Sequence, residues 1–245
     1  MSISIDQLST LAVASVAAFG LALLSAVAGF GGGVLLLPVF TALFGFRVAV
    51  PMLTLTQVSS NVARMWLNRR ELHWPLIGWF AAGAVPFAVA GGLLLATVPL
   101  GALKRVLGVF LIAVVVWRRW QRRPRKPSDR SFAAVGAASG LGSALLGSVG
   151  PLTAPFFLAY GLTRGAYVGT EAAGAVTMHL SKIAAYGAGD LLTGRVLLFG
   201  AALTPATLAG AWAGKKIVGR ISDRAFVLLV EAGLVAAGAL FLCGF

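Results

Sequence analysis

The chain has 245 residues, of which 59% are hydrophobic and only 11% are charged, and its formal net charge is +13 at pH 7. Soluble domains carry roughly 25% charged residues, and their helices cannot hide a charge-free stretch such as the 40 residues between Asp6 and Arg47. The composition therefore excludes a soluble enzyme and a nucleic-acid-binding domain, and it indicates a membrane protein with several helical crossings of about 20 apolar residues each.

The first part of the chain, residues 1–123, contains five hydrophobic segments, in order 8–28, 31–45, 48–67, 74–97 and 101–120. The second segment is short, because it has 15 residues, and it opens with Gly31, Gly32 and Gly33. At about 1.5 Å per residue it cannot cross a hydrocarbon core of about 30 Å. We therefore expect a half-helix that forms a hairpin with the segment before it.

The run of basic residues within 118–130 joins this part to the next. Basic residues beside a membrane contribute about 1 kcal/mol each through attraction to anionic lipids. We expect the run to set the orientation of the chain and to contact membrane lipids, with binding of a partner as the alternative.

The second part of the chain, residues 124–245, repeats the same order, with segments at 131–147, 150–162, 165–187, 194–214 and 224–243. Gly33 aligns with Gly150 at an offset of 117 residues, each is followed five residues later by proline, and the same offset aligns Arg47 with Arg164. A shared offset across glycine, proline and arginine indicates a duplication. The predicted fold is one all-α integral membrane domain made of two five-segment repeats.

The basic residues divide unequally between the two sides of this predicted membrane domain. Fourteen of the 20 fall in loops on one side, four fall on the other side, and Arg64 and Lys182 lie inside the membrane. Cytoplasmic loops carry the excess of Lys and Arg, so the first side is predicted to be cytoplasmic and both termini periplasmic. The two repeats then have opposite orientations, which is the plan of many secondary transporters.

Several short motifs resemble those of the sulfite exporter TauE/SafE family. They are Gly29-Phe-Gly-Gly-Gly-Val-Leu-Leu-Leu-Pro38, Leu72-His-Trp74 and Val168-Gly-Thr170, and the resemblance covers nearly the whole chain. It implies a bacterial inner-membrane transporter of sulfite, a sulfonate or a related sulfur-containing anion. The sequence departs from the family's pattern at two places that bear on substrate specificity. Val50-Pro51-Met52 replaces the family's usual Val-Gly-Thr in the first half, and Gly147-Ser-Val-Gly150 has fewer glycines than the corresponding run in the first half.

The glycine-rich breaks are the first candidate for a substrate site. The N-terminus of a helix presents unpaired N–H groups and a partial positive charge, which suits an anion, and glycine lets the anion approach the backbone closely. We expect the half-helices that begin near Gly32 and Gly150 to bind the substrate with opposed N-termini. The alternative is that these glycines only permit close packing of helices.

Two polar stripes are the second candidate. In 48–67 and the residue that follows, polar side chains recur at three- and four-residue steps, and they are Thr54, Gln57, Asn61, Arg64 and Asn68. In 165–187 a matching stripe holds Glu171, His179, Lys182 and Tyr186. A cation inside a membrane segment usually faces a cavity or a partner. Lys182 could instead reach toward the membrane surface, His179 could be a hydrogen-bonded structural residue, and Glu171 could be either a proton carrier or the partner of a cation.

The sequence thus predicts a secondary transporter that moves a small anion by rocking one repeat against the other. The predicted substrate-binding residues are Gly31, Gly32, Gly33, Gln57, Asn61, Arg64, Gly150, Glu171, His179 and Lys182. No catalytic, metal-binding or nucleotide-binding pattern is present, so no enzyme activity and no cofactor is expected. The alternatives are a proton- or cation-coupled importer and a non-transporting scaffold or sensor component. The oligomeric state stays open, and a homo-oligomer is compatible with the sequence.

Overall fold

The computed structural model describes residues 5–28, 33–94, 126–146 and 150–243, together with a few residues between 105 and 120. The helices in these ranges are α1 (Ile5–Ala28), α2 (Gly33–Phe44), α3 (Phe46–Leu67), α4 (Trp74–Leu94), α6 (Ser131–Leu146), α7 (Gly150–Tyr160), α8 (Arg164–Ala188), α9 (Gly194–Val218) and α10 (Asp223–Leu242). No strand occurs among the described residues, which confirms the expected all-α class. The predicted segment 101–120 lies largely outside them, as do Gly31, Gly32 and Gly147.

Three of the described helices are long and apolar enough to cross a membrane: Ser9–Val27 within α1, the whole of α4 and the whole of α9. The two short helices lie within the predicted segments 31–45 and 150–162, and they are short as expected: α2 has 12 residues and α7 has 11. Each ends at a glycine with a positive φ, Gly45 at 77° and Gly161 at 101°. This left-handed conformation costs glycine nothing because it has no Cβ, so the chain turns sharply from each short helix into the long helix that follows.

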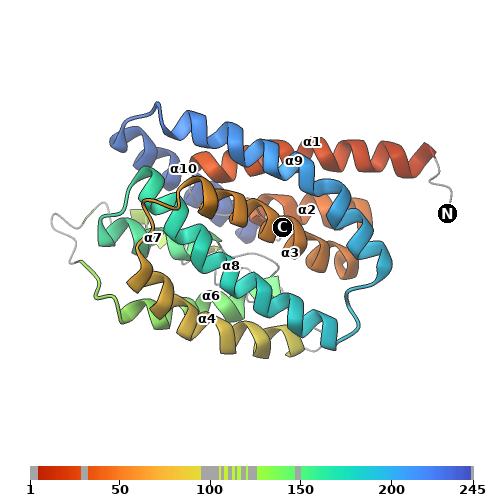
Figure 1. Cartoon of the computed structure of the whole chain (residues 1–245), viewed down its shortest axis with the longest axis horizontal. Helices are drawn as coiled ribbons and strands as arrows, with labels where there is room; N and C mark the ends of the chain where they lie inside the picture. The colour runs from red at the N-terminus through yellow and green to blue at the C-terminus, as the bar shows by residue number, and fades with distance from the viewer. Residues whose placement is uncertain are drawn as a thin grey trace.

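Glycines bring two pairs of helices into backbone contact. In Figure 1, α1 and α9 lie along one edge of the molecule and α4 and α6 along the opposite edge. A Cβ added to Gly136 or Gly140 of α6 would collide with the backbone of α4, and one added to Gly210 of α9 would collide with the backbone of α1. Small residues at such crossings let helices approach closely enough for van der Waals contact, which drives helix association in lipid.

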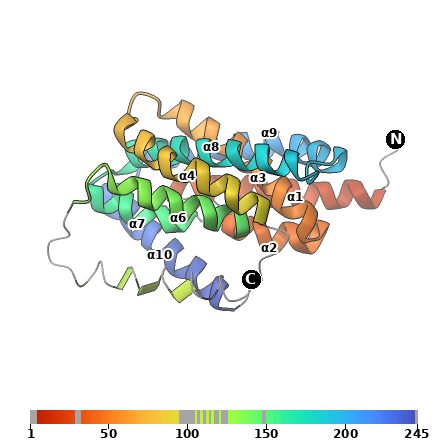
Figure 2. The same cartoon turned by 90° about the horizontal axis from the view of Figure 1, so that it is seen from below.

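The buried apolar side chains form two separate cores. The α4–α6 core contains Phe80 of α4, Phe132 of α6, Phe157 of α7 and Tyr167 of α8. The α1–α9 core contains Ala18 from α1, Phe40 from α2, Leu53 from α3 and Leu203 from α9. Each core therefore combines helices from both halves of the sequence. Helices α3 and α8 run between the two cores, and Figure 2 shows the same bundle with α10 packed beneath it.

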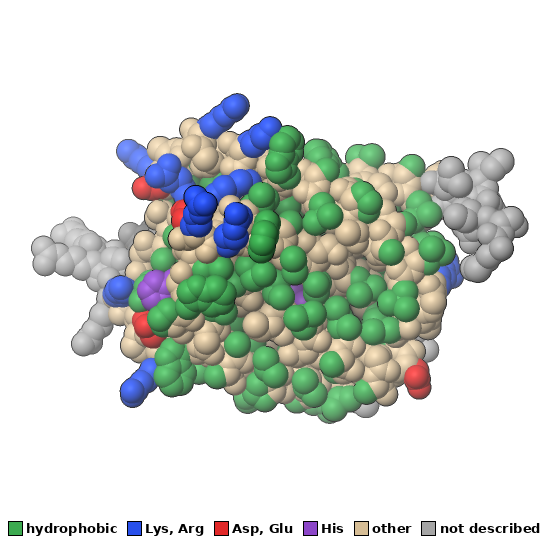
Figure 3. Space-filling view, in the orientation of Figure 1, with side chains coloured by type: hydrophobic (Ala, Val, Ile, Leu, Met, Phe, Trp, Pro, Cys, Tyr) green, Lys and Arg blue, Asp and Glu red, His purple; other side chains and the backbone are tan. Residues whose placement is uncertain are grey.

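Among the described residues, Lys and Arg gather at one end of the bundle, as the face drawn in Figure 3 shows. Arg164 at the start of α8 pairs with Asp223 at the start of α10 at 2.6 Å, and Lys215 near the end of α9 lies 3.6 Å from Glu71. This basic end also holds the end of α3 and the start of α4. The opposite end, where Arg195 stacks on Phe199 at the start of α9, has few charges among the described residues.

Candidate functional site

The two predicted polar stripes meet in the interior. On α3, Gln57, Asn61 and Arg64 are buried, and on α8 Glu171, His179 and Lys182 are buried. Because α3 packs directly against α8, the stripes face each other between the two cores. The structure therefore buries all six of these predicted site residues on two helices that pack together.

A buried ion pair joins the two stripes. The Nη2 of Arg64 donates to Oε2 of Glu171 and to Oδ1 of Asn61, each at 2.6 Å, and its Nη1 donates to the hydroxyl oxygen of Ser25 on α1 at 3.0 Å. The side chains of Arg64 and Glu171 are only 1% and 3% exposed. The Nε of Arg64 is buried without a hydrogen-bond partner. Glu171 thus has the arrangement expected of the partner of a cation, the second of its two predicted roles.

Lys182 is a second buried cation that, like Arg64, donates a hydrogen bond to a serine of a neighbouring helix. Its ammonium donates to the hydroxyl of Ser143 on α6 at 3.1 Å and lies 5.9 Å from the centre of the Tyr186 ring. Lys182 is fully buried, so it does not extend to the membrane surface. The separation of 39 residues between Lys182 and Ser143 equals that between Arg64 and Ser25. Each cation is therefore held by a serine at the same position relative to it in the chain.

A small cavity lies beside the ion pair, with about 10 Å³ of space for the centre of a water molecule, enough for about one water. It is lined by five predicted site residues, which are Gln57, Asn61, Gly150, Glu171 and His179. Ser139 of α6 and Thr153 of α7 line it as well. The Nδ1 of His179 and the Oγ of Ser139 are buried without a hydrogen-bond partner, so two of the residues that line this space carry a polar group that could donate to a ligand.

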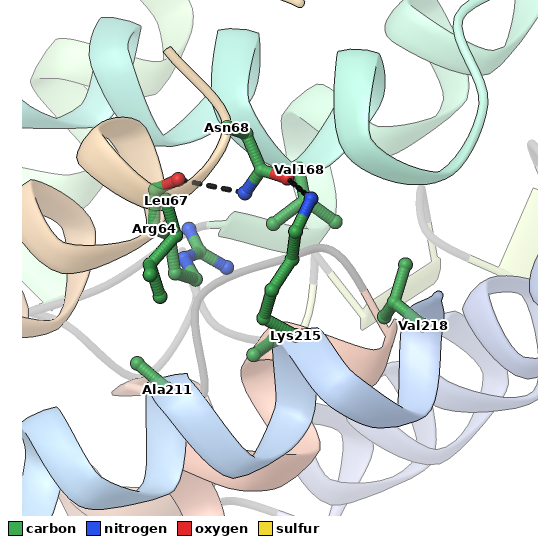
Figure 4. Close-up of a pocket in the computed structure, with 8 residues that line it drawn as sticks. Arg64, Leu67, Asn68, Val168, Ala211, Lys215 and Val218 are labelled. Atoms are coloured by element: carbon green, nitrogen blue, oxygen red, sulfur yellow. Dashed lines mark hydrogen bonds between the residues drawn. The ribbon is translucent and has the colours of Figure 1, made fainter. Parts of the chain in front are cut away.

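A second, smaller cavity lies on the side of the ion pair nearer the basic end (Figure 4). Lys215 of α9 reaches across it and donates to the side-chain oxygen of Asn68, whose amide nitrogen in turn donates to the backbone oxygen of Arg64 at 2.7 Å. Arg64 lines this cavity, whereas Asn61 and Glu171 line the cavity with Ser139. The ion pair therefore separates the two spaces.

The structure tests the placement of the glycines only in part. Gly150 begins α7 and lines the cavity. Gly33 begins α2, but Gly31 and Gly32 lie outside the described residues. The predicted opposition of two glycine-rich N-termini stays a prediction.

Sequence reasoning missed the hydroxyl groups of Ser25, Ser139, Ser143 and Thr153. A signal was present for two of them, because Ser25 and Ser143 are 118 residues apart, as are Arg64 and Lys182. Ser139 and Thr153 lie in apolar segments that only the packing of α6 and α7 against the stripes turns into cavity walls. In the part of the chain that the structure describes, no group of three His, Cys, Asp or Glu side chains could hold a metal ion.

Comparison with known proteins adds one match. The model of a family described as Sulfite exporter TauE/SafE matches residues 14–241. No curated protein and no solved structure gives a significant match to the chain.

Proposed function

The chain belongs to the sulfite exporter TauE/SafE family, because the match covers nearly its whole length, and from this premise we propose that it is a secondary transporter of sulfite, a sulfonate or a similar sulfur oxyanion in the bacterial inner membrane. The observation that carries the proposal is the cavity between α3, α7 and α8. It is buried, and two of the residues that line it, Ser139 and His179, carry an unpartnered polar atom that can donate a hydrogen bond. The sulfite dianion and a sulfonate offer only acceptors, so these donors match them.

The buried stripes also separate the transporter from its rival in another class. A scaffold or sensor would present its polar stripes to lipid headgroups or to a partner, whereas here they face the protein interior. The available space suits about one water molecule, so a sulfur oxyanion needs more room than this conformation provides. The proposal therefore includes an opening motion, and the conformation described is a closed one.

We further propose that residues 1–123 and 124–245 are inverted repeats, with the basic end in the cytoplasm and both termini in the periplasm. Two features support the duplication: α4 packs on α6 as α9 packs on α1, and the buried cations share their serine spacing. The two cores are the units that rock in this proposal, and not the two halves of the sequence, because each core packs helices of both halves together.

Export is the direction that the proposal favours. An inside-negative membrane potential drives anion exit by about 2.3 kcal/mol per charge for each 100 mV, so no coupled ion is required. An importer would need a group that takes up and releases a proton, and the candidates are His179 and Glu171, of which the surroundings of Glu171 discriminate between import and export. Its carboxylate accepts a hydrogen bond from Arg64 at 2.6 Å, which favours a held charge over a proton carrier.

Replacing the buried lysine tests transport directly. We expect Lys182→Ala to reduce the flux of sulfite or methanesulfonate through proteoliposomes at least tenfold, because the variant removes a fully buried cation one helical turn from His179, which lines the cavity. Lys216→Ala is the matched control, since Lys216 is exposed and stacks on Trp212 at the surface. Equal flux through Lys182→Ala and the wild type would reject a pathway role for Lys182. Absence of flux of every sulfur anion tested, with well-folded wild type, would reject the transporter itself.

The unpartnered hydroxyl of Ser139 gives a second test. A buried polar group without a partner costs about 1–3 kcal/mol, and a hydrogen bond to a charged group contributes about 1.5–3 kcal/mol. We therefore expect Ser139→Ala to leave the melting temperature equal or higher and to raise the KM for transport roughly 10- to 100-fold. Ser181→Ala is the control, because its hydroxyl bonds the Thr177 backbone oxygen of its own helix. A lower melting temperature with unchanged KM would show that Ser139 serves structure and not substrate.

A further inference from the structure

The ion pair between Arg64 and Glu171 lies at the position that a gate between the cavity and the basic end would occupy. It separates the cavity that contains His179 from the smaller space at the basic end. It also joins α3, whose Leu53 lies in the α1–α9 core, to α8, whose Tyr167 lies in the α4–α6 core. A solute that leaves the cavity toward the basic end therefore has to pass this pair.

The two ends of α8 are attached to different cores. Near its start, Tyr167 and Val168 belong to the α4–α6 core. Near its end, the ring of Tyr186 packs into the α1–α9 core, while its hydroxyl donates to the backbone oxygen of Ala144 on α6 at 3.0 Å. Tyr186 thus ties the two cores together at the end away from the basic loops. A motion that separates the cores at the basic end can pivot there.

Arg64 is built to accept a second anion. Ser25 and Asn61 hold its Nη1 and Nη2 from α1 and α3, on its own side of the interface, and only Glu171 comes from α8. The Nε is buried without a partner. A guanidinium binds an oxyanion best through two parallel N–H groups, and here the Nε has no partner and the Nη2 is bonded to a carboxylate that, like the substrate, is an anion.

From this geometry, and resting on the proposed function, we propose that Arg64 and Glu171 form an anion-exchange gate, in which the substrate oxyanion replaces the Glu171 carboxylate on Arg64. Ser25 and Asn61 keep the guanidinium in place during the exchange. Once Glu171 loses its cation and faces the substrate anion, like-charge repulsion drives the start of α8 away from α3, and the path to the basic end opens. A ligand can shift a conformation only by binding the two states differently, and the competition for Arg64 supplies that difference.

Hydrogen exchange measured by mass spectrometry tests the gate without reagents that react with sulfite. The reporters are peptides covering 60–72 and 164–175, on the two sides of the pair, and the probe is whichever of sulfite or methanesulfonate the wild type carries. In the wild type we expect the anion to speed exchange in these peptides more than tenfold. In Glu171→Gln we expect fast exchange without any anion, and less than a twofold further change when the anion is added.

Glu71→Gln is the matched control, because Glu71 also faces a cation, Lys215, but is exposed at the basic end. It should respond to the anion as the wild type does. If Glu171→Gln does not fold, the double variant Arg64→Gln/Glu171→Gln removes both charges, and it should exchange fast and ignore the anion. Slow hydrogen exchange in the folded Glu171 variants, or an equal response to the anion with and without Glu171, would overturn the gate. The proposed function would still stand if the wild type transports the anion. If the wild type carries no anion, both the proposed function and the replacement of Glu171 by the substrate are overturned. Fast hydrogen exchange in Glu171→Gln would then show only that the ion pair holds the two helices together.

Discussion

Glu171→Ala is expected to lower the free energy of unfolding by about 3–5 kcal/mol, the range seen when one member of a buried ion pair is removed. The reason is that the Arg64 guanidinium, only 1% exposed, keeps its charge and loses its carboxylate. Its other acceptors, Asn61 and Ser25, are neutral and cannot replace that charge. Unfolding in a titration of denaturing detergent, followed by circular dichroism, measures the change.

The double variant Arg64→Leu/Glu171→Leu should recover most of the lost stability, because replacing both charges with apolar groups of similar size is often neutral or stabilising. It should nevertheless fail to transport, since it lacks both gate residues. The control Glu71→Ala should change the unfolding free energy by less than about 1 kcal/mol, as expected for a pair at the surface. If Glu171→Ala cost no more than this control, the buried pair would not hold the two cores together.

Gly83→Ala is expected to disrupt the crossing of α4 and α6 at a cost of at least about 1–3 kcal/mol, the usual cost of overpacking. An added Cβ would overlap the backbone oxygen of Ala133, and it would lie 2.8 Å from the backbone nitrogen of Ala137. Backbone atoms of a helix cannot be displaced as easily as the end of a flexible side chain, so α4 and α6 have to move apart. The measurement is the melting temperature and the yield of monodisperse protein in detergent.

Gly78→Ala provides the matched control within the same helix. A Cβ at Gly78 meets nothing within 4 Å, and the position is exposed. Alanine is favoured over glycine in a helix interior by about 1 kcal/mol, so this variant should be neutral or slightly more stable. Equal behaviour of the two variants would show that the α4–α6 crossing tolerates a wider separation than the structure indicates.

Much of the helix plan was predictable from the sequence. Charge-free stretches and the glycine–proline pairs located the short helices α2 and α7 and the long helices around them, because hydropathy and backbone breakers act locally. The polar spacing on α3 and α8 also predicted that Arg64 and Glu171 lie on inward-facing stripes. These features depend on residues within a few turns of one another.

Which helices pack against each other could not be predicted from the sequence. Helices α4 and α6 are both apolar on all sides, so hydropathy says nothing about which neighbour each contacts. Ser139 carried no signal either, since one hydroxyl in a segment of Ala and Gly also fits a helix crossing. The sequence also left open which cation would pair with Glu171, because Arg64 and Glu171 are 107 positions apart and meet only when the cores assemble.

The mixing of the two halves in each core also determines the order in which the protein can be assembled. During synthesis α1, α2 and α3 precede α9, the helix that completes their core, and α4 precedes its partner α6. Until α8 is made, Arg64 has no carboxylate, and a cation inside lipid is costly. We therefore expect the early helices to be only loosely packed in the bilayer until α8 and α9 have been made, so that the final packing forms late in synthesis.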